Sequence, residues 1–117
     1  MKNNDLKQRT KQFALRVIRM ADSLPKTMAS DVVGRQLLRS ATSVASNYRA
    51  ACRGRSKAEF VAKLGIVEEE SDESSFWLEI VEEAEMLPAK KIGSLREESD
   101  EITAIIVASI RTARHRG

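Results

Sequence analysis

The stretch from Arg35 to Leu78 constrains the fold most, because it encodes two long helices of opposite charge in direct succession. It begins basic, is interrupted once at Arg53-Gly54-Arg55-Ser56, and ends acidic at Trp77-Leu78. Apolar residues on both sides of the interruption recur every three to four positions, which is the spacing of one helix face. We therefore expect two helices joined by a tight turn.

Two helices are predicted in the first half of the chain. The first covers about residues 6–23 and ends before Pro25, because the residue preceding a proline is pushed out of the α region. The second begins near Ser30, a plausible N-cap, and ends at Gly54, a natural residue to follow a helix. Its apolar stripe is predicted to face the core and consists of Val33, Leu37, Ala41, Val44, Tyr48 and Ala51.

Two further helices are predicted in the second half. The third opens with a capping box of Ser56 and Glu59 and extends to about Met86. The fourth covers about residues 94–114, with acidic first turns and a basic last turn that suit the helix dipole. The fold class is therefore all-α. We expect residues 1–117 to form a single domain, an antiparallel up-down-up-down four-helix bundle.

The third helix carries two stripes, which indicates contacts on two sides, from its own bundle and from another subunit. The second stripe contains Glu70, Glu73 and Trp77. Trp77 is predicted to be a core or interface anchor. The two carboxylates are predicted to pair with arginines of the second helix, fixing either helix register or a subunit contact. The candidate arginines are Arg35, Arg39 and Arg49.

The net charge of +3 conceals a strong separation of charge along the chain. Residues 1–55 contain 12 Lys or Arg and 3 Asp or Glu, whereas residues 56–101 contain 5 basic and 14 acidic residues. Basic helices can pair with acidic ones, inside the fold or between subunits. Alternatively, a basic surface can remain free to bind phosphate. The sequence leaves both alternatives open.

Candidate nucleic-acid-binding residues follow from this distribution. Arg53, Arg55 and Lys57 lie beside a predicted helix N-terminus, a position that favours phosphate, and Arg16 and Arg19 add cations on the first helix. Other cations are scattered over the first half and the C-terminus. An aromatic content of 4% argues against a stacking platform for single-stranded nucleic acid.

The residues for catalysis or metal binding are scarce. The chain has one cysteine, Cys52, and one histidine, His115, so neither a disulfide nor a Glu-x-x-His metal site can be built. We therefore expect no enzyme activity, no metal and no cofactor. The N-terminus lacks the apolar core of a signal peptide, and no segment is apolar enough to span a bilayer, so we expect a cytoplasmic protein with no membrane partner.

A set of motifs is spread over about residues 6–114: Gln36-Leu37-Leu38-Arg39-Ser40-Ala41, then Arg55-Ser56 with Glu59-Phe60, then Glu69, Glu73 and Trp77-Leu78. This set resembles the four-helix bundle proteins of the S23 class, encoded in intervening sequences of bacterial 23S ribosomal RNA genes. The chain departs from many relatives at Asn47-Tyr48-Arg49-Ala50-Ala51, where they read Asn-Ile-Ala-Glu-Gly.

The resemblance implies assembly into a ring, commonly a homopentamer, and no enzymatic activity. It also implies kinship with accessory proteins of diversity-generating retroelements, which bind nucleic acid and a reverse transcriptase. Our expectation is a non-enzymatic oligomeric binding module that binds RNA or DNA through a basic surface. The alternative is a protein–protein scaffold whose charges are used in self-assembly.

Overall fold

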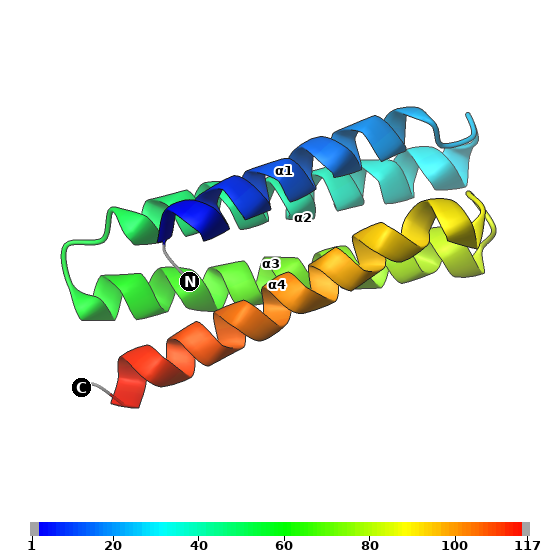
Figure 1. Cartoon of the computed structure of the whole chain (residues 1–117). Helices are drawn as coiled ribbons and strands as arrows, with labels where there is room; N and C mark the ends of the chain where they lie inside the picture. The colour runs from blue at the N-terminus through cyan, green and yellow to red at the C-terminus, as the bar shows by residue number, and fades with distance from the viewer. Residues whose placement is uncertain (1–2, 116–117) are drawn as a thin grey trace.

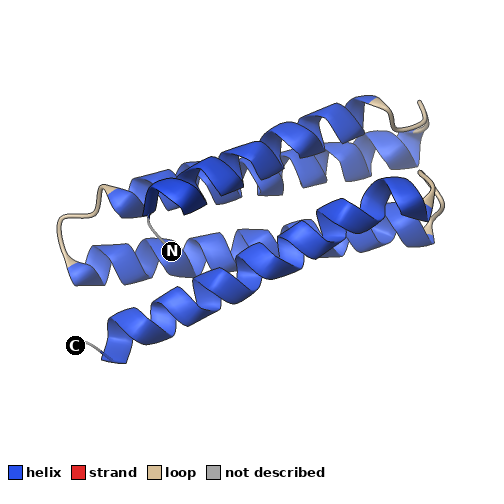
Figure 2. Ribbon diagram, viewed as in Figure 1, coloured by secondary structure: helices blue, strands red, loops and turns tan. Residues whose placement is uncertain are grey.

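The computed structural model describes residues 3–115 and contains four helices. They are α1 (Asn3–Asp22), α2 (Met28–Cys52), α3 (Lys57–Glu83) and α4 (Ala89–His115). Successive helices run in opposite directions and form a rod of 48 × 20 × 19 Å (Figure 1). No strand occurs among residues 3–115 (Figure 2). The predicted all-α, up-down-up-down four-helix bundle is confirmed.

The helices form two hairpins, α1–α2 and α3–α4, which lie one over the other (Figure 1). The most extensive helix–helix interface joins α2 to α3, and the sparsest joins α1 to α4. Because the chain order follows the perimeter of the bundle, α1 is held mainly by α2. The hairpin that sequence analysis identified as basic therefore faces the hairpin that it identified as acidic.

The core is built from the stripes predicted on α2 and α3. All six stripe residues of α2 are buried, from Val33 to Ala51. On α3 the first stripe is buried from Leu64 to Val81, and Phe60 is half-buried at its start. The second stripe of α3 is only partly covered, and Ile66 remains 38% exposed. This face of α3 is therefore available for contacts outside the bundle core.

A layer of hydroxyl side chains crosses the otherwise apolar core. Ser74 Oγ donates to Ser40 Oγ over 3.0 Å between α2 and α3. Between α3 and α4, Ser71 and Thr103 share a hydrogen bond of 2.5 Å, and Ser75 and Ser99 share one of 2.6 Å. Small side chains allow the helices to approach closely, and no buried side-chain polar atom among the described residues lacks a partner. The layer is therefore compatible with burial.

The start of α2 differs from the prediction. Thr27, not Ser30, is the N-cap, and its hydroxyl accepts a hydrogen bond of 3.1 Å from the Ser30 amide. Ser30 is itself buried within the first turn of the helix. Both residues have the chemistry of a cap, and the helix begins earlier because Thr27 follows the Leu24-Pro25 turn closely enough to initiate it.

The end of α3 also differs, because the helix stops at Glu83 instead of continuing to Met86. Glu85 adopts a left-handed backbone conformation with φ of 57°. The Met86 amide donates to the Val81 carbonyl over 2.9 Å and the Glu85 amide to the Glu82 carbonyl over 3.0 Å. This pair of bonds is the Schellman motif, which is usually built on glycine. Sequence analysis missed it because glutamate is an unusual residue at that position.

The start of α4 was predicted five residues too late. The helix begins at Ala89, directly after Pro88, whose carbonyl accepts from the Lys91 amide over 2.9 Å. Its first turn therefore holds Lys90 and Lys91 and no acidic residue, so the predicted acidic start is wrong. The basic last turn, with Arg114 and His115, matches the prediction.

Candidate nucleic-acid interface

The turn between α2 and α3 presents the cations predicted to meet phosphate. Arg53 is the C-cap of α2, and its amide donates to the carbonyls of Ala50 and Ala51. Gly54 follows it without a positive φ. A Cβ at Gly54 would lie 3.1 Å from the Ala51 carbonyl oxygen, so lack of space, rather than backbone conformation, favours glycine there. The turn is therefore tight.

The capping of α3 directs these cations outward. The Ser56 hydroxyl accepts from the Glu59 amide over 3.1 Å, as the capping box predicts. The Glu59 carboxylate accepts from the Arg55 amide over 2.6 Å, one residue before the predicted partner. Both groups thus satisfy amides at the turn. The side chains of Arg53, Arg55 and Lys57 are exposed, as a phosphate-binding role requires.

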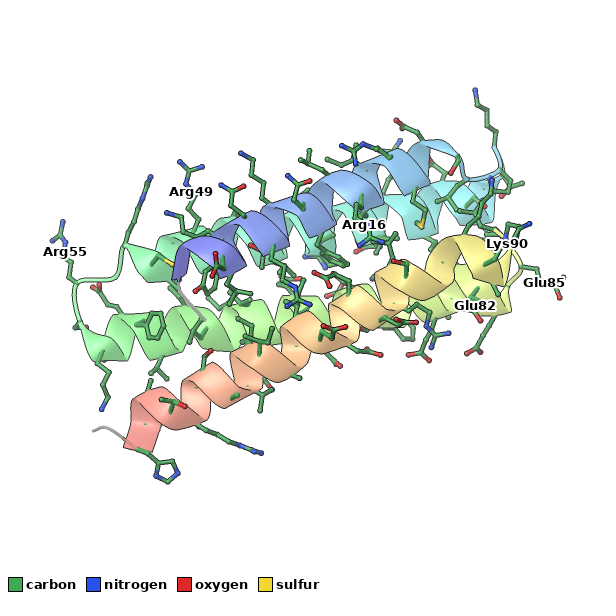
Figure 3. All side chains as sticks on the ribbon, in the orientation of Figure 1. Arg16, Arg49, Arg55, Glu82, Glu85 and Lys90 are labelled. Atoms are coloured by element: carbon green, nitrogen blue, oxygen red, sulfur yellow. The ribbon has the colours of Figure 1, made fainter. Side chains whose placement is uncertain are left out.

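The other two predicted nucleic-acid-binding residues lie elsewhere. Arg16 is half-buried on α1, and its guanidinium donates to the Ser94 hydroxyl of α4 over 2.7 Å. Figure 3 shows Arg16 directed toward α4, far from Arg55. Arg19 is exposed, but it lies one turn further from the α2–α3 turn. The structure therefore does not bring the five predicted cations into one patch.

Cations from all four helices gather instead at one end of the bundle, which we call the basic end. This end contains the start of α1, the end of α2, the start of α3 and the end of α4. Among the described residues, these cations form no ion pair. They are Lys7, Lys11, Arg49, Arg53, Arg55, Lys57, Lys63, Arg111 and Arg114. Arg116, a further C-terminal cation, lies outside the described residues.

Sequence analysis did not group these cations, because they are far apart along the chain. The signal that could have found them is the antiparallel order of the predicted helices, which places residues near 7, 49, 57 and 111 at the same end. Figure 3 shows Arg49 and Arg55 toward this end, with Glu82, Glu85 and Lys90 at the opposite end. The bundle is therefore polarised along its length.

A second cluster joins α2 to α3. Arg39 donates to Glu70 over 3.2 Å and also to Glu73. The Trp77 indole N–H donates to the Glu73 carboxylate over 3.0 Å. This bond and the Arg39 guanidinium lower the pKa of Glu73, and Glu73 in turn raises the pKa of Arg39. The cluster connects two helices of one chain. This corresponds to the predicted role in fixing helix register, one of the two roles that the sequence left open.

The other two candidate arginines do not join this cluster. Arg35 pairs with Asp31 over 3.1 Å, one turn earlier on α2. Within the chain it does not pair with Glu70 or Glu73, because Asp31 is an i,i+4 carboxylate on the same exposed helix face. Arg49 belongs to the basic end and has no ion-pair partner among residues 3–115.

An ion-pair network that sequence analysis missed holds the sparse α1–α4 seam. Arg9 donates to both carboxylate oxygens of Glu98 over 2.7 and 2.8 Å, and to Glu101 over 2.6 Å. The hydrogen bonds from Arg9 lower the pKa of Glu98, and those to Glu98 and Glu101 raise the pKa of Arg9. Arg96 similarly pairs with Glu82 over 3.0 Å, between α4 and α3.

The described residues offer no other chemistry of note. No group of three or more His, Cys, Asp or Glu side chains within residues 3–115 is arranged to hold a metal ion. Cys52 is a half-buried free thiol beside Tyr48. Burial raises the pKa of the Tyr48 hydroxyl. None of the described helices combines the length and the apolar character needed to cross a membrane.

Comparison with known proteins identifies relatives. Residues 2–108 match the model of the family described as 23S rRNA-intervening sequence protein. The fold is similar to a crystal structure of a protein with unknown function from the S23 ribosomal protein family of Bacteroides thetaiotaomicron, with a TM-score of 0.87 and 32% sequence identity. The alignment covers 95% of this chain and 99% of that one.

A search of curated proteins finds no match. Neither the family description nor that of the structural neighbour indicates an enzymatic activity. The family match covers nearly the whole chain, and the structural match extends over the same four helices. The chain belongs to the family of 23S rRNA-intervening sequence proteins.

Proposed function

We propose that this protein is a non-enzymatic, oligomeric binding module that binds RNA or DNA through its basic end. The observation that carries the proposal is the gathering of exposed and half-buried cations from all four helices, which form no ion pair with any described residue. Cations already paired with carboxylates would gain little from phosphate. Unpaired ones can displace the counterions that surround a nucleic acid.

Assembly into a ring-like homo-oligomer, a homopentamer in our expectation, forms part of the proposal. Each subunit would contribute a copy of the basic end, so that weak contacts add up to useful avidity on one long ligand. The pairing of Arg9 with Glu98 and of Arg39 with Glu70 supports the basic end as the binding surface, since these two central arginines are already satisfied within the chain. The cations of the basic end have no such partner among the described residues.

The test compares the nucleic-acid affinity of a variant with reversed charges at the α2–α3 turn with the affinity of a matched control variant. R53E/R55E reverses two cations of the basic end, and K90E/K91E reverses two exposed cations at the opposite end, with the same change in net charge. We expect the first variant to bind an RNA or DNA oligonucleotide at least about tenfold more weakly, with a shallower salt dependence. The second should bind like the unaltered protein.

Two results would contradict the proposal. Absence of binding by the unaltered protein at low salt would exclude a nucleic-acid module. Equal loss in the two variants would mean that overall charge, and not the basic end, determines the affinity. Far-ultraviolet circular dichroism of both variants checks that the bundle is retained.

The alternative function, a protein–protein scaffold, is favoured by a different observation. The α2–α3 pair exposes large apolar side chains: Met28 is 86%, Val32 53% and Phe76 49% exposed. Where such side chains form one contiguous patch, they mark a contact surface. We expect V32S/F76S to lower the mass of the assembly in light scattering, whereas I18S, at an exposed apolar position on α1, should not. An unchanged mass would exclude these side chains from the subunit contact.

A further inference from the structure

We propose that a groove between α1 and α2 is a binding site for the sugar–phosphate backbone of a nucleic acid, held without base stacking. This inference deepens the proposed function and rests on it. The groove has a volume of about 510 Å³. Its lining consists of Lys7, Gln8, Lys11, Ala14, Thr42, Ala45, Ser46 and Arg49.

The charge of the lining favours an anion. The groove contains Lys7, Lys11 and Arg49 and no carboxylate. Two other surface hollows differ in this respect. The hollow over the α1–α2 loop includes Asp22 and Asp31, and the one at the α2–α3 turn includes Glu59. Because no carboxylate of the lining neutralises these three cations, the α1–α2 groove is the hollow in which phosphate would meet the least repulsion.

The shape of the groove places the cations on both of its walls. Lys7 and Lys11 are one helical turn apart on α1, about 6 Å along the axis. Arg49 faces them from α2, on the outer side of the hairpin (Figure 3). Ala14 and Ala45 are small side chains, which leave the groove open between the two walls. A phosphate chain lying along the groove could therefore contact cations on both sides.

The hydrogen-bonding groups of the lining further restrict the ligand. Thr42 Oγ1 donates to the Leu38 carbonyl over 2.7 Å, and Ser46 Oγ donates to the Ser43 carbonyl over 3.4 Å. These hydroxyl protons are thus engaged within α2. The donors that remain for a ligand are the three cations and the amide of Gln8. A site with several charged donors suits phosphate oxygens, which accept hydrogen bonds and carry negative charge.

The distribution of aromatic side chains explains why the site would bind backbone and not bases. Phe13 and Tyr48 are buried, and Phe60 is half-buried against the core. The exposed aromatic side chain among the described residues, Phe76, lies on α3, outside the lining of the groove. Without a ring to stack on, a ligand in the groove is held through its charges, and binding should tolerate any base sequence.

The groove is the part of the basic end that leads to the α2–α3 turn. Arg49 lies one turn before Arg53 on the same helix, so cations follow one another from the groove to the α2–α3 turn. The cations of the turn and those of the groove can thus contact successive phosphates of one strand. The position of the groove therefore indicates the path that a bound strand would follow along the bundle. The α2–α3 turn alone does not indicate such a path.

The experiment compares two triple neutralisations with the same change in net charge. K7Q/K11Q/R49Q removes the cations of the groove, and K26Q/K90Q/K91Q removes three exposed cations that lie outside both the groove and the basic end. The probe is a short fluorescein-labelled DNA duplex, followed by anisotropy over a range of salt concentrations. We expect the groove variant to bind at least about tenfold more weakly, with the slope of log affinity against log salt reduced by about 2 to 3. The control should stay within about twofold of the unaltered protein.

The outcomes separate this inference from the proposed function. If the unaltered protein binds the duplex and both triple variants bind equally, the groove site is excluded while the turn remains the candidate interface. If the unaltered protein binds neither RNA nor DNA, the proposed function fails and the groove fails with it. A competing strand made of abasic sites should displace the duplex as well as a normal strand does. Failure of the abasic strand to compete would overturn the backbone assignment.

Discussion

The hydroxyl of Ser74 donates a hydrogen bond of 3.0 Å to the hydroxyl of Ser40, at a point where both side chains are fully buried between α2 and α3. The Ser40 hydroxyl donates to the Leu37 carbonyl of its own helix, and the single proton of Ser74 is shared between Ser40 and the Glu70 carbonyl. The pair therefore combines close helix approach with satisfied polar groups, next to the Arg39 cluster that joins the same two helices.

We expect S74A to lower the free energy of unfolding by about 1 kcal/mol, the net value of one buried hydrogen bond. The loss stays small because the Ser40 hydroxyl keeps its bond to the Leu37 carbonyl. Urea denaturation measures it. S46A, at an exposed serine of α2, is the control and should leave the midpoint unchanged. A loss of several kcal/mol in S74A would show that the hydroxyl layer has a larger role than one bond.

We expect E98Q to reduce stability at neutral pH by about 1 kcal/mol, because it breaks a partly buried bidentate pair with Arg9. Since the folded protein lowers the pKa of Glu98 below its ordinary 4.5, the contribution is present above that value and is lost as the pH falls through the folded-state pKa. The difference between E98Q and the unaltered protein should therefore shrink as the pH falls below 4.5.

The control for this pair is E97Q, which removes an exposed carboxylate one residue away. It should have little effect at either pH, as is usual for exposed charges. Thermal unfolding of E98Q, E97Q and the unaltered protein makes the comparison. It is measured at neutral pH and again below the ordinary glutamate pKa of 4.5. A pH-independent cost of E98Q would contradict the ionic origin of the effect.

We expect E85G to stabilise the protein by about 1 kcal/mol, because glycine adopts the left-handed conformation of the Schellman motif without the Cβ penalty that Glu85 incurs. E69G, at an exposed interior position of α3, should instead destabilise the protein by about 1 kcal/mol. Opposite signs for the same substitution inside α3 and just after its end would confirm the backbone assignment. Destabilisation by both would refute it.

Trp77 is the one tryptophan of the chain and donates to Glu73, so its fluorescence should report the titration of that carboxylate. The midpoint should lie below the ordinary glutamate value, because the indole and Arg39 both favour the ionised form. In R39Q the midpoint should rise but remain lowered, since the indole N–H still donates. A midpoint that R39Q leaves in place would mean that Arg39 does not act on Glu73.

The fold was predictable from the sequence because helix periodicity is a local property. The apolar stripe from Val33 to Ala51 could be recognised from the spacing of its own residues. The capping box of Ser56 and Glu59 could be recognised within a segment of four residues. The pairing of Arg39 with Glu70 was within reach because both lie in consecutive helices of complementary charge. A predicted helix boundary was wrong where two nearby residues could both act as the N-cap, as Thr27 and Ser30 could.

The pairing of Arg9 with Glu98 was beyond this reasoning, because the residues are 89 positions apart and their contact depends on how α1 and α4 meet. The hydrogen bond from Arg16 to Ser94 was beyond it for the same reason, since Ser94 lies on α4. The basic end and its groove likewise become visible only when four helices are placed side by side. The charge totals of the sequence segments correctly identify the first hairpin as basic and the second as acidic. They do not show which charges gather at each end of the bundle.

The even number of helices has a practical consequence. Asn3 and His115 both lie at the basic end (Figure 1), so an affinity tag or fluorophore attached to either terminus would emerge among the cations. Immobilisation through a tag would then turn these cations toward the support and shield them from a ligand in solution. With Cys52 replaced by serine, a label on a cysteine introduced in the α3–α4 loop, near Glu85, would leave them accessible.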